Sequence, residues 1–148
     1  MFGRVLHTYF LATRALTLGV RAAVITPDDA FVLVRHSYTP GWHFPGGGLE
    51  MNEIASEGLR REIEQEAGIS APLDLSLFGV YFNQAVSKRD HVLLFTCRYS
   101  GQIPRKSASL EIAAIGAFGL DDLPSDIDRG TERRMREIQG LEKMDSVW

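Results

Sequence analysis

The chain has 148 residues, a length that suits one domain with a conventional hydrophobic core. Hydrophobic residues make up 45% and charged residues 24% of the sequence, as in an ordinary soluble globular protein. The formal net charge of −3 argues against sequence-independent binding of nucleic acid, because that binding needs a basic surface. A small anionic substrate is compatible with this charge, since local positive charge or a metal ion can bind it.

Residues 1–18 carry apolar side chains at mostly helical spacing and are predicted to form an amphipathic helix. Arg4 and Arg14 interrupt the segment, so it lacks the apolar core of a signal peptide and the roughly 20 apolar residues of a membrane span. We expect this helix to pack on the sheet of the domain; a dimer contact or a wall of the substrate site is the alternative. The expectation is a cytoplasmic monomer or homodimer without a membrane partner.

Apolar, β-branched runs bounded by turn residues predict the strands. The first two, 20–26 and 31–36, are joined by a Pro-Asp-Asp-Ala turn and look like a hairpin. Further strands are predicted at 42–44, 75–82, 92–99 and 110–118, and a final helix at 128–141 carries one narrow apolar stripe. This order of elements predicts an α/β fold, a mixed sheet with helices on its faces.

Cysteine and histidine give no sign of a disulfide or a zinc site. Cys97 is the only cysteine and lies in an apolar run, which favours a buried, inert thiol over a reactive one. The four histidines are scattered, and none has metal-ligand spacing to another or to Cys97.

Several residues near a glycine-rich turn are candidate substrate contacts. Arg35 and His36 lie a few residues before the turn, where they could contact a phosphate, and Trp42 or Tyr38 could stack on a base. An ordinary structural role is the alternative for each. Arg35 would then be a solvated strand residue, as is also expected of Arg21 and His36, and Trp42 would pack.

The glycine-rich turn at residues 45–48 leads into a charged segment. Asn52 is a favoured N-cap for a helix, and Gly68 is a favoured residue just beyond a helix end. Residues 53–67 are therefore predicted to form one helix.

Two acidic residues of this helix face inward. At 100° per residue, counted from Ile54, Glu62 lies at about 80° and Glu66 at about 120°, in the middle of the apolar arc. Two carboxylates on an inward face repel each other and lose hydration, and a divalent cation would compensate both effects.

The same residues resemble the Nudix box, G-x5-E-x7-R-E-U-x-E-E-x-G-U, in which U is apolar. Residues 47–69 agree with every fixed position except one, where Gln65 stands in place of a glutamate. The resemblance implies a single domain over residues 1–148 with the Nudix-type α/β/α sandwich. It also implies a hydrolase that cleaves a pyrophosphate bond in a nucleotide or a nucleoside-diphosphate-linked small molecule, with Mg²⁺ or Mn²⁺ as cofactor.

The resemblance assigns roles to the residues of the box. Glu62 and Glu66, with the backbone carbonyl of Gly46, would bind the metal, since such cations take oxygen ligands. Glu53 and Arg61 would orient the catalytic carboxylates, or would only stabilise the helix as an ion pair. The predicted catalytic residues are Glu53, Arg61, Glu62 and Gln65.

Gln65 is the departure from the family pattern. Its neutral side chain can coordinate a cation through oxygen but adds no charge and cannot act as a base, so we expect weaker metal binding or fewer metals. Glu50 is a candidate compensating acid. Glu111 is another, because some Nudix enzymes bring an acidic residue to the metals from this region; an exposed strand-end glutamate is the alternative.

Three functional hypotheses follow from these patterns. The first is the metal-dependent pyrophosphohydrolase that the resemblance implies. The second, motivated by Gln65, is a catalytically weak or inactive Nudix-fold module that binds a nucleotide. The third is an α/β domain in which the motif is accidental.

Overall fold

The structure is a computed structural model that describes the backbone of residues 2–148 and the side chains of residues 6–148. Its elements are, in chain order, α1 (Phe2–Arg14), β1 (Thr17–Ile25), β2 (Phe31–His36), β3 (Trp42–His43), β4 (Gly46–Gly48), α2 (Ala55–Glu62), the π-helix η1 (Ile63–Ala67), β5 (Ser76–Phe82), β6 (Asp90–Arg98), β7 (Ile112–Phe118) and α3 (Arg129–Ile138). None of the helices in this described part has the length and apolarity to cross a membrane.

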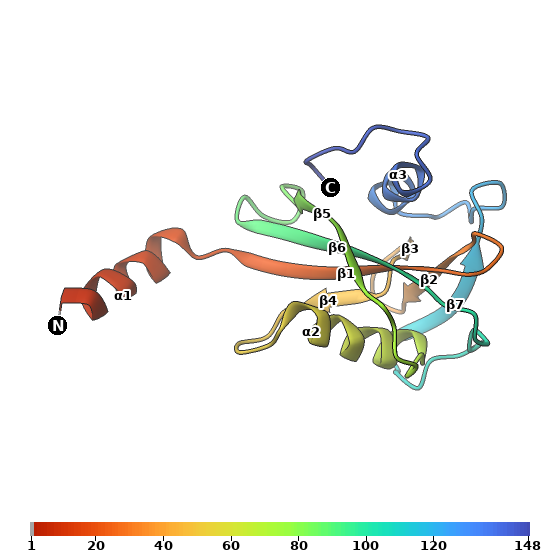
Figure 1. Cartoon of the computed structure of the whole chain (residues 1–148), viewed down its shortest axis with the longest axis horizontal. Coiled ribbons are helices and arrows are strands. Elements are labelled where there is room, and N and C mark those ends of the chain that lie inside the picture. The colour runs from red at the N-terminus through yellow and green to blue at the C-terminus, as the bar shows by residue number, and fades with distance from the viewer. Residues whose placement is uncertain (1) are drawn as a thin grey trace.

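The strands form one mixed sheet, which has seven strands within the described residues. Its order is β3-β2-β1-β6-β5, with β4 paired to β1 and β7 paired to β2. β1 and β6 are parallel from end to end, and the other strand pairs are antiparallel. Figure 1 shows α2 on one face of the sheet and α3 on the other. The predicted α/β/α arrangement with a mixed sheet is confirmed.

Each face of the sheet has its own apolar core, because successive residues of a strand point to opposite faces. Val20 and Val24 of β1 pack with Leu59 and Ile63 on the α2 side. Ala23 and Ile25, from the same strand, belong to the core on the α3 side, with Phe31, Phe44, Tyr81 and Met135. The central strand is therefore covered on both faces.

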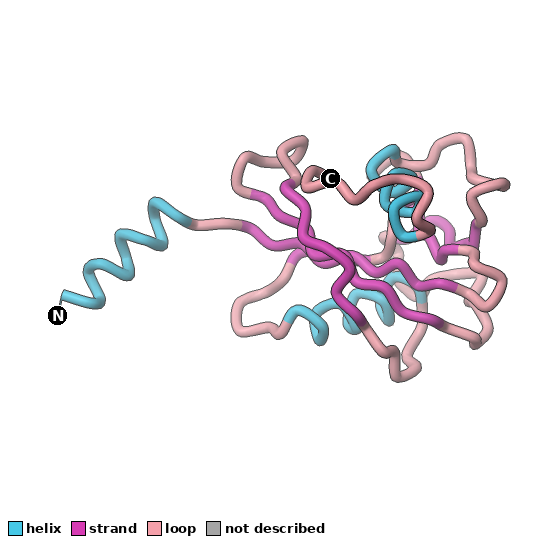
Figure 2. The backbone as a smooth tube through the Cα atoms, turned by 45° about the horizontal axis from the view of Figure 1, so that its top comes forward, coloured by secondary structure: helices cyan, strands magenta, loops and turns pink. Residues whose placement is uncertain are grey.

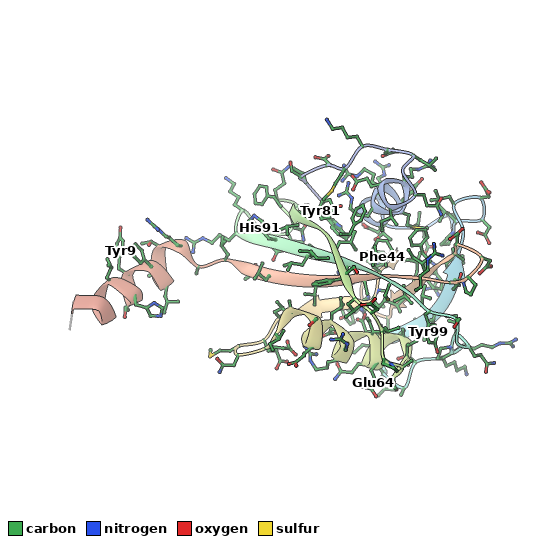
Figure 3. All side chains as sticks on the ribbon, viewed as in Figure 1. Tyr9, Phe44, Glu64, Tyr81, His91 and Tyr99 are labelled. Carbon is green, nitrogen blue, oxygen red and sulfur yellow. The ribbon has the colours of Figure 1, made fainter. Side chains whose placement is uncertain are left out.

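The N-terminal helix differs from expectation. α1 lies beyond the end of the sheet and covers neither face, in both Figure 1 and Figure 2. Tyr9, labelled in Figure 3, is 59% exposed, and Leu6 is 52% exposed. The helix ends at Arg14, short of residue 18, because Thr17 already pairs with Asp90 as the first residue of β1. The expected packing of this helix on the sheet is wrong.

The first two strands also pair less than a hairpin would. β1 and β2 are adjacent through the predicted turn, yet their ladder is confined to Ile25 opposite Phe31. Residues 19–21 of β1 pair with β4 instead. The glycines 46–48, expected to be a turn, are thus a short strand held at the centre of the sheet.

α3 docks as predicted but buries more than its apolar stripe. Asp128 caps its start by accepting a hydrogen bond from the backbone N–H of Thr131 at 2.8 Å. The charged residues Arg134 and Glu137 are both buried as well. Arg134 donates to Glu137 and to the carbonyl of Val147, each at 2.7 Å, so the C-terminal segment is tied to the helix.

Candidate active site

The helical part of the motif starts later than predicted. Asn52 adopts a left-handed conformation with φ of 62°, and Ile54 is still extended, so α2 begins only at Ala55. Glu53 therefore precedes the helix. After Glu62 the backbone widens into the π-helix η1, a feature often found at functional sites. Gly68, with φ of 67°, ends it as predicted.

Glu66 reaches from η1 to the glycine strand. Its Oε2 accepts a hydrogen bond from the backbone N–H of Gly46 at 2.8 Å, and its Oε1 lies 2.6 Å from Nε2 of His36. The residue is only 8% exposed, so these partners replace the water that a carboxylate otherwise binds.

Glu62 lies against Gly47. A Cβ added to Gly47 would be 2.7 Å from the carboxyl carbon of Glu62, so only glycine leaves room for this carboxylate. Gly46 is equally constrained, because a Cβ there would overlap the carbonyl oxygen of Val20 on β1. The two glycines thus allow backbone and carboxylates to approach closely.

Arg61 connects the carboxylates of Glu62 and Glu53. It donates to Glu62 at 2.5 Å, and its Nε and Nη2 donate to the two oxygens of Glu53 at 2.9 and 3.2 Å. Arg61, and secondarily the backbone N–H of Glu50, lower the pKa of Glu53 by hydrogen bonding to its charged form. The same bond to Glu53 is the main cause that raises the pKa of Arg61.

A cavity of about 340 Å³ opens beside these groups. It is lined by Arg21, His36, Tyr38, Thr39, His43, Gly46, Gly47, Glu62, Glu66 and Glu111. Glu111, a candidate additional acid, is therefore brought together with Glu62 and Glu66. Its carboxylate makes no hydrogen bond or ion pair with the residues that the structure describes.

Arg35 and Trp42 are not brought to this cavity. They lie opposite each other in the β2–β3 ladder and so share one face of the sheet. Trp42 is buried on the α3 side, with its ring centroid 4.9 Å from that of Phe118. Arg35 approaches Asp126 at 3.8 Å. Neither residue could therefore contact a substrate bound in this cavity from its present position.

Sequence reasoning missed three of the residues that line the cavity: Arg21, Thr39 and His43. His36 and Tyr38, which were weighed as a phosphate contact and a base contact, do line it. The period of two along a strand could have found the histidines. His36 and His43 each follow a residue whose side chain lies on the α3 side, so their own side chains belong to the α2 side.

Two other predicted residues lie outside the cavity. Gln65 is exposed, and its side-chain oxygen accepts a hydrogen bond from Arg61 at 3.4 Å. Glu50 is exposed and contributes its backbone N–H to Glu53 at 3.0 Å. Glu64, which lies between Glu62 and Glu66 in the chain, points away from the sheet and accepts a hydrogen bond from the Ser70 hydroxyl at 3.1 Å (Figure 3). Their positions give no support to a catalytic Gln65 or a compensating Glu50.

The chemistry of the cavity fits a hard divalent cation. Glu62, Glu66 and the Gly46 carbonyl offer oxygen atoms, the ligands that Mg²⁺ and Mn²⁺ take. A carboxylate has about four lone-pair sites, so the hydrogen bonds described above leave capacity for a cation. Among the described residues, no group of three or more His, Cys, Asp or Glu side chains could by itself hold a metal ion. The protein would therefore supply two carboxylates and one backbone oxygen as ligands. Water and substrate would supply the others, as is usual for Mg²⁺.

Comparison with known proteins gives a consistent result. The sequence model of the NUDIX domain matches residues 15–138. A MutT-like protein from Streptomyces ambofaciens is 28% identical over 131 residues, which cover 88% of this chain and 77% of the relative.

Solved structures share the fold. The MutT NUDIX hydrolase from Burkholderia pseudomallei superposes with a TM-score of 0.67 at 24% identity, over 82% of this chain and 97% of the other. The NUDIX domain of Shewanella oneidensis NrtR, solved with ADP ribose, gives a TM-score of 0.71 at 18% identity, over 90% and 96% of the two chains. At these identities the likeness shows the fold.

Proposed function

The chain belongs to the Nudix family, whose domain model matches most of its length, and on this premise we propose that it hydrolyses a pyrophosphate bond in a nucleotide or a nucleoside-diphosphate-linked small molecule. Nudix hydrolases act on pyrophosphate bonds, and family members take small nucleotide-linked compounds, such as the ADP ribose bound to the Shewanella domain. The proposed cofactor is Mg²⁺ or Mn²⁺.

One observation carries this proposal. Glu62 and Glu66, which lie one turn apart on the motif helix, both line the cavity beside Gly46 and Gly47. An acidic pair in a mostly buried position repels itself and loses hydration unless positive charge compensates it. A bound divalent cation would supply that charge, would neutralise phosphate oxygens and would acidify a water molecule for attack on phosphorus.

The chain's own residues would divide the remaining work. Arg61, held by both oxygens of Glu53, fixes the Glu62 carboxylate at one place, so Glu53 and Arg61 act as positioning residues. His36 and the Gly46 N–H fix Glu66 in the same way. Glu111 lines the cavity and its carboxylate has no partner among the described residues, which suits the group that would take the proton from the attacking water.

The alternative, a nucleotide-binding module without turnover, was motivated by Gln65. Gln65 is exposed and does not line the cavity, so its neutral side chain removes no carboxylate from the group formed by Glu62, Glu66 and Glu111. This placement favours the hydrolase.

A panel assay tests the proposal. Purified protein with Mg²⁺ or Mn²⁺ is incubated with nucleoside di- and triphosphates, sugar-linked and dinucleoside diphosphates, and the phosphate products are measured. Hydrolysis of at least one compound, lost on chelation, is the expected result. Glu62→Gln and Glu66→Gln should lose the activity, whereas Glu64→Gln, a matched change on the outer side of the same helix, should keep it.

Two outcomes would contradict the proposal. Nucleotide binding without turnover by the wild type, together with turnover on Gln65→Glu, would establish the binding module instead. Activity that survives both Glu62→Gln and Glu66→Gln would place the chemistry elsewhere. The cytoplasmic location and the monomeric or homodimeric state stay predictions.

A further inference from the structure

Arg21 is the cavity residue that neither the motif nor the metal site explains. It is the only lysine or arginine among the described residues that line the cavity, where it faces three carboxylates. It lies on β1 directly opposite Gly46 in the β1–β4 ladder. Its Nη1 donates to the carbonyl of Phe44 at 3.2 Å and to that of Gly46 at 3.0 Å.

The Gly46 peptide has little freedom to avoid this contact. Its backbone is pressed against Val20, where no Cβ could fit, and its N–H is bonded to Glu66. Its carbonyl is thus fixed in the direction of the Arg21 guanidinium. This carbonyl is also the backbone oxygen proposed as a metal ligand.

A guanidinium and a divalent cation at one carbonyl compete. The oxygen has two lone pairs, so it could accept from both, but a cation held by this carbonyl would add a second positive charge beside Nη1, which already donates to it. In a half-buried position this repulsion is screened less by bulk water than it would be at the exposed surface. Cation binding at Gly46 therefore favours release of Arg21 from the carbonyls.

We infer that Arg21 is a binding residue for the pyrophosphate group, which it engages after exchanging the two carbonyls for phosphate oxygens. An arginine suits this role, since its planar fork matches phosphate geometry. The released guanidinium would then meet part of the substrate's negative charge within the cavity. This inference rests on the proposed function, because it concerns the same cavity and substrate class.

The inference predicts opposite effects on two binding events. Arg21→Ala removes a competitor for the Gly46 carbonyl, so Mn²⁺ alone should bind at least threefold more tightly. The same change removes a phosphate ligand, so methylenediphosphonate, a pyrophosphate analogue with a P–C–P bridge that resists hydrolysis, should bind at least tenfold more weakly in the presence of Mg²⁺. Arg21→Lys keeps the charge but not the fork and should fall between wild type and Arg21→Ala in both titrations.

The experiment is a pair of calorimetric titrations on the full chain, with thermal unfolding as a check of folding. Arg98→Ala is the matched control, an arginine on the neighbouring strand β6 that does not line the cavity, and it should change neither affinity. If Arg21→Ala and Arg21→Lys weaken both binding events together, or change neither, the inference is overturned. If the wild type hydrolyses pyrophosphates but Arg21→Ala changes neither affinity, only the inference about Arg21 is refuted. If the wild type neither binds the analogue nor hydrolyses any compound of the panel, the proposed function is refuted.

Discussion

Replacing Gly47 by alanine tests whether the position of the Glu62 carboxylate sets the activity. The added Cβ would lie 2.7 Å from the carboxyl carbon and one oxygen of Glu62, and 2.9 Å from the other oxygen. Ordinary contact begins at 3.4 Å, so the carboxylate must recede from 2.7 to 3.4 Å, by about 0.7 Å. Gly47 has no positive φ, so alanine adds no backbone strain there.

The displacement is small for folding and large for catalysis. Catalytic groups need placement within about 0.5 Å, and a shift of about 1 Å can cost about 100-fold in rate. We therefore expect kcat/KM to fall by about 10- to 100-fold, equivalent to about 1.4–2.7 kcal/mol of transition-state stabilisation. The free energy of unfolding should change by no more than about 0.5 kcal/mol, because the end of a flexible side chain can move aside.

Steady-state kinetics on a substrate from the panel, with thermal unfolding, measures both quantities. Gly48→Ala is the control, because a Cβ at Gly48 would meet no atom within 4 Å and its backbone has no positive φ. This control should behave as wild type. Full activity of Gly47→Ala, or an equal loss in Gly48→Ala, would refute the reasoning that the close approach of Gly47 and Glu62 positions the carboxylate.

Three further changes test other parts of the site. Glu53→Gln should lower the unfolding temperature above about pH 4.5, the ordinary pKa of the carboxyl, because Arg61 lowers the folded-state pKa of Glu53. The difference from wild type should vanish as the pH falls through that lower pKa. Equal unfolding curves at neutral pH would contradict this expectation. Glu111→Gln should lower kcat/KM by about 10- to 100-fold with an unchanged unfolding temperature, since the carboxylate has no described partner to lose; unaltered kinetics would exclude a role in the reaction. Burial raises the pKa of Cys97 to about 11, so iodoacetamide should leave the native thiol unmodified at about pH 8 and alkylate it in guanidinium; rapid labelling of the native protein would argue against burial.

The sequence predicted the direction of side chains well where a repeating pattern reflects the geometry of a single helix. Helical periodicity alone placed Glu62 and Glu66 on the inward side of the motif helix, and both line the cavity. The same wheel assigned Ile54 to the buried face, yet this residue is 61% exposed because it precedes the helix. The inward direction of the two glutamates did not depend on where the helix begins.

The errors came from tertiary pairing, which local patterns do not specify. Arg35 was chosen for its closeness along the chain to the glycine strand and Trp42 for its aromatic ring, whereas their register across β2 and β3 turns both away from the cavity. Arg21 was treated as a solvated residue because nothing local links it to Gly46, its partner across the sheet. The exposed position of α1 was equally hidden, since an apolar stripe does not say which surface it covers.

The parallel pairing of β1 with β6 has a consequence for how the site is assembled. Thr17 is joined to Asp90 and Ile25 to Arg98, so this ladder brings together segments that lie far apart in the chain. The glycine strand is hydrogen-bonded to the same strand β1, and so its support includes residues well beyond the motif. A fragment limited to residues 47–69 would carry all the acidic residues of the box but would have no rigid strand against which to orient them.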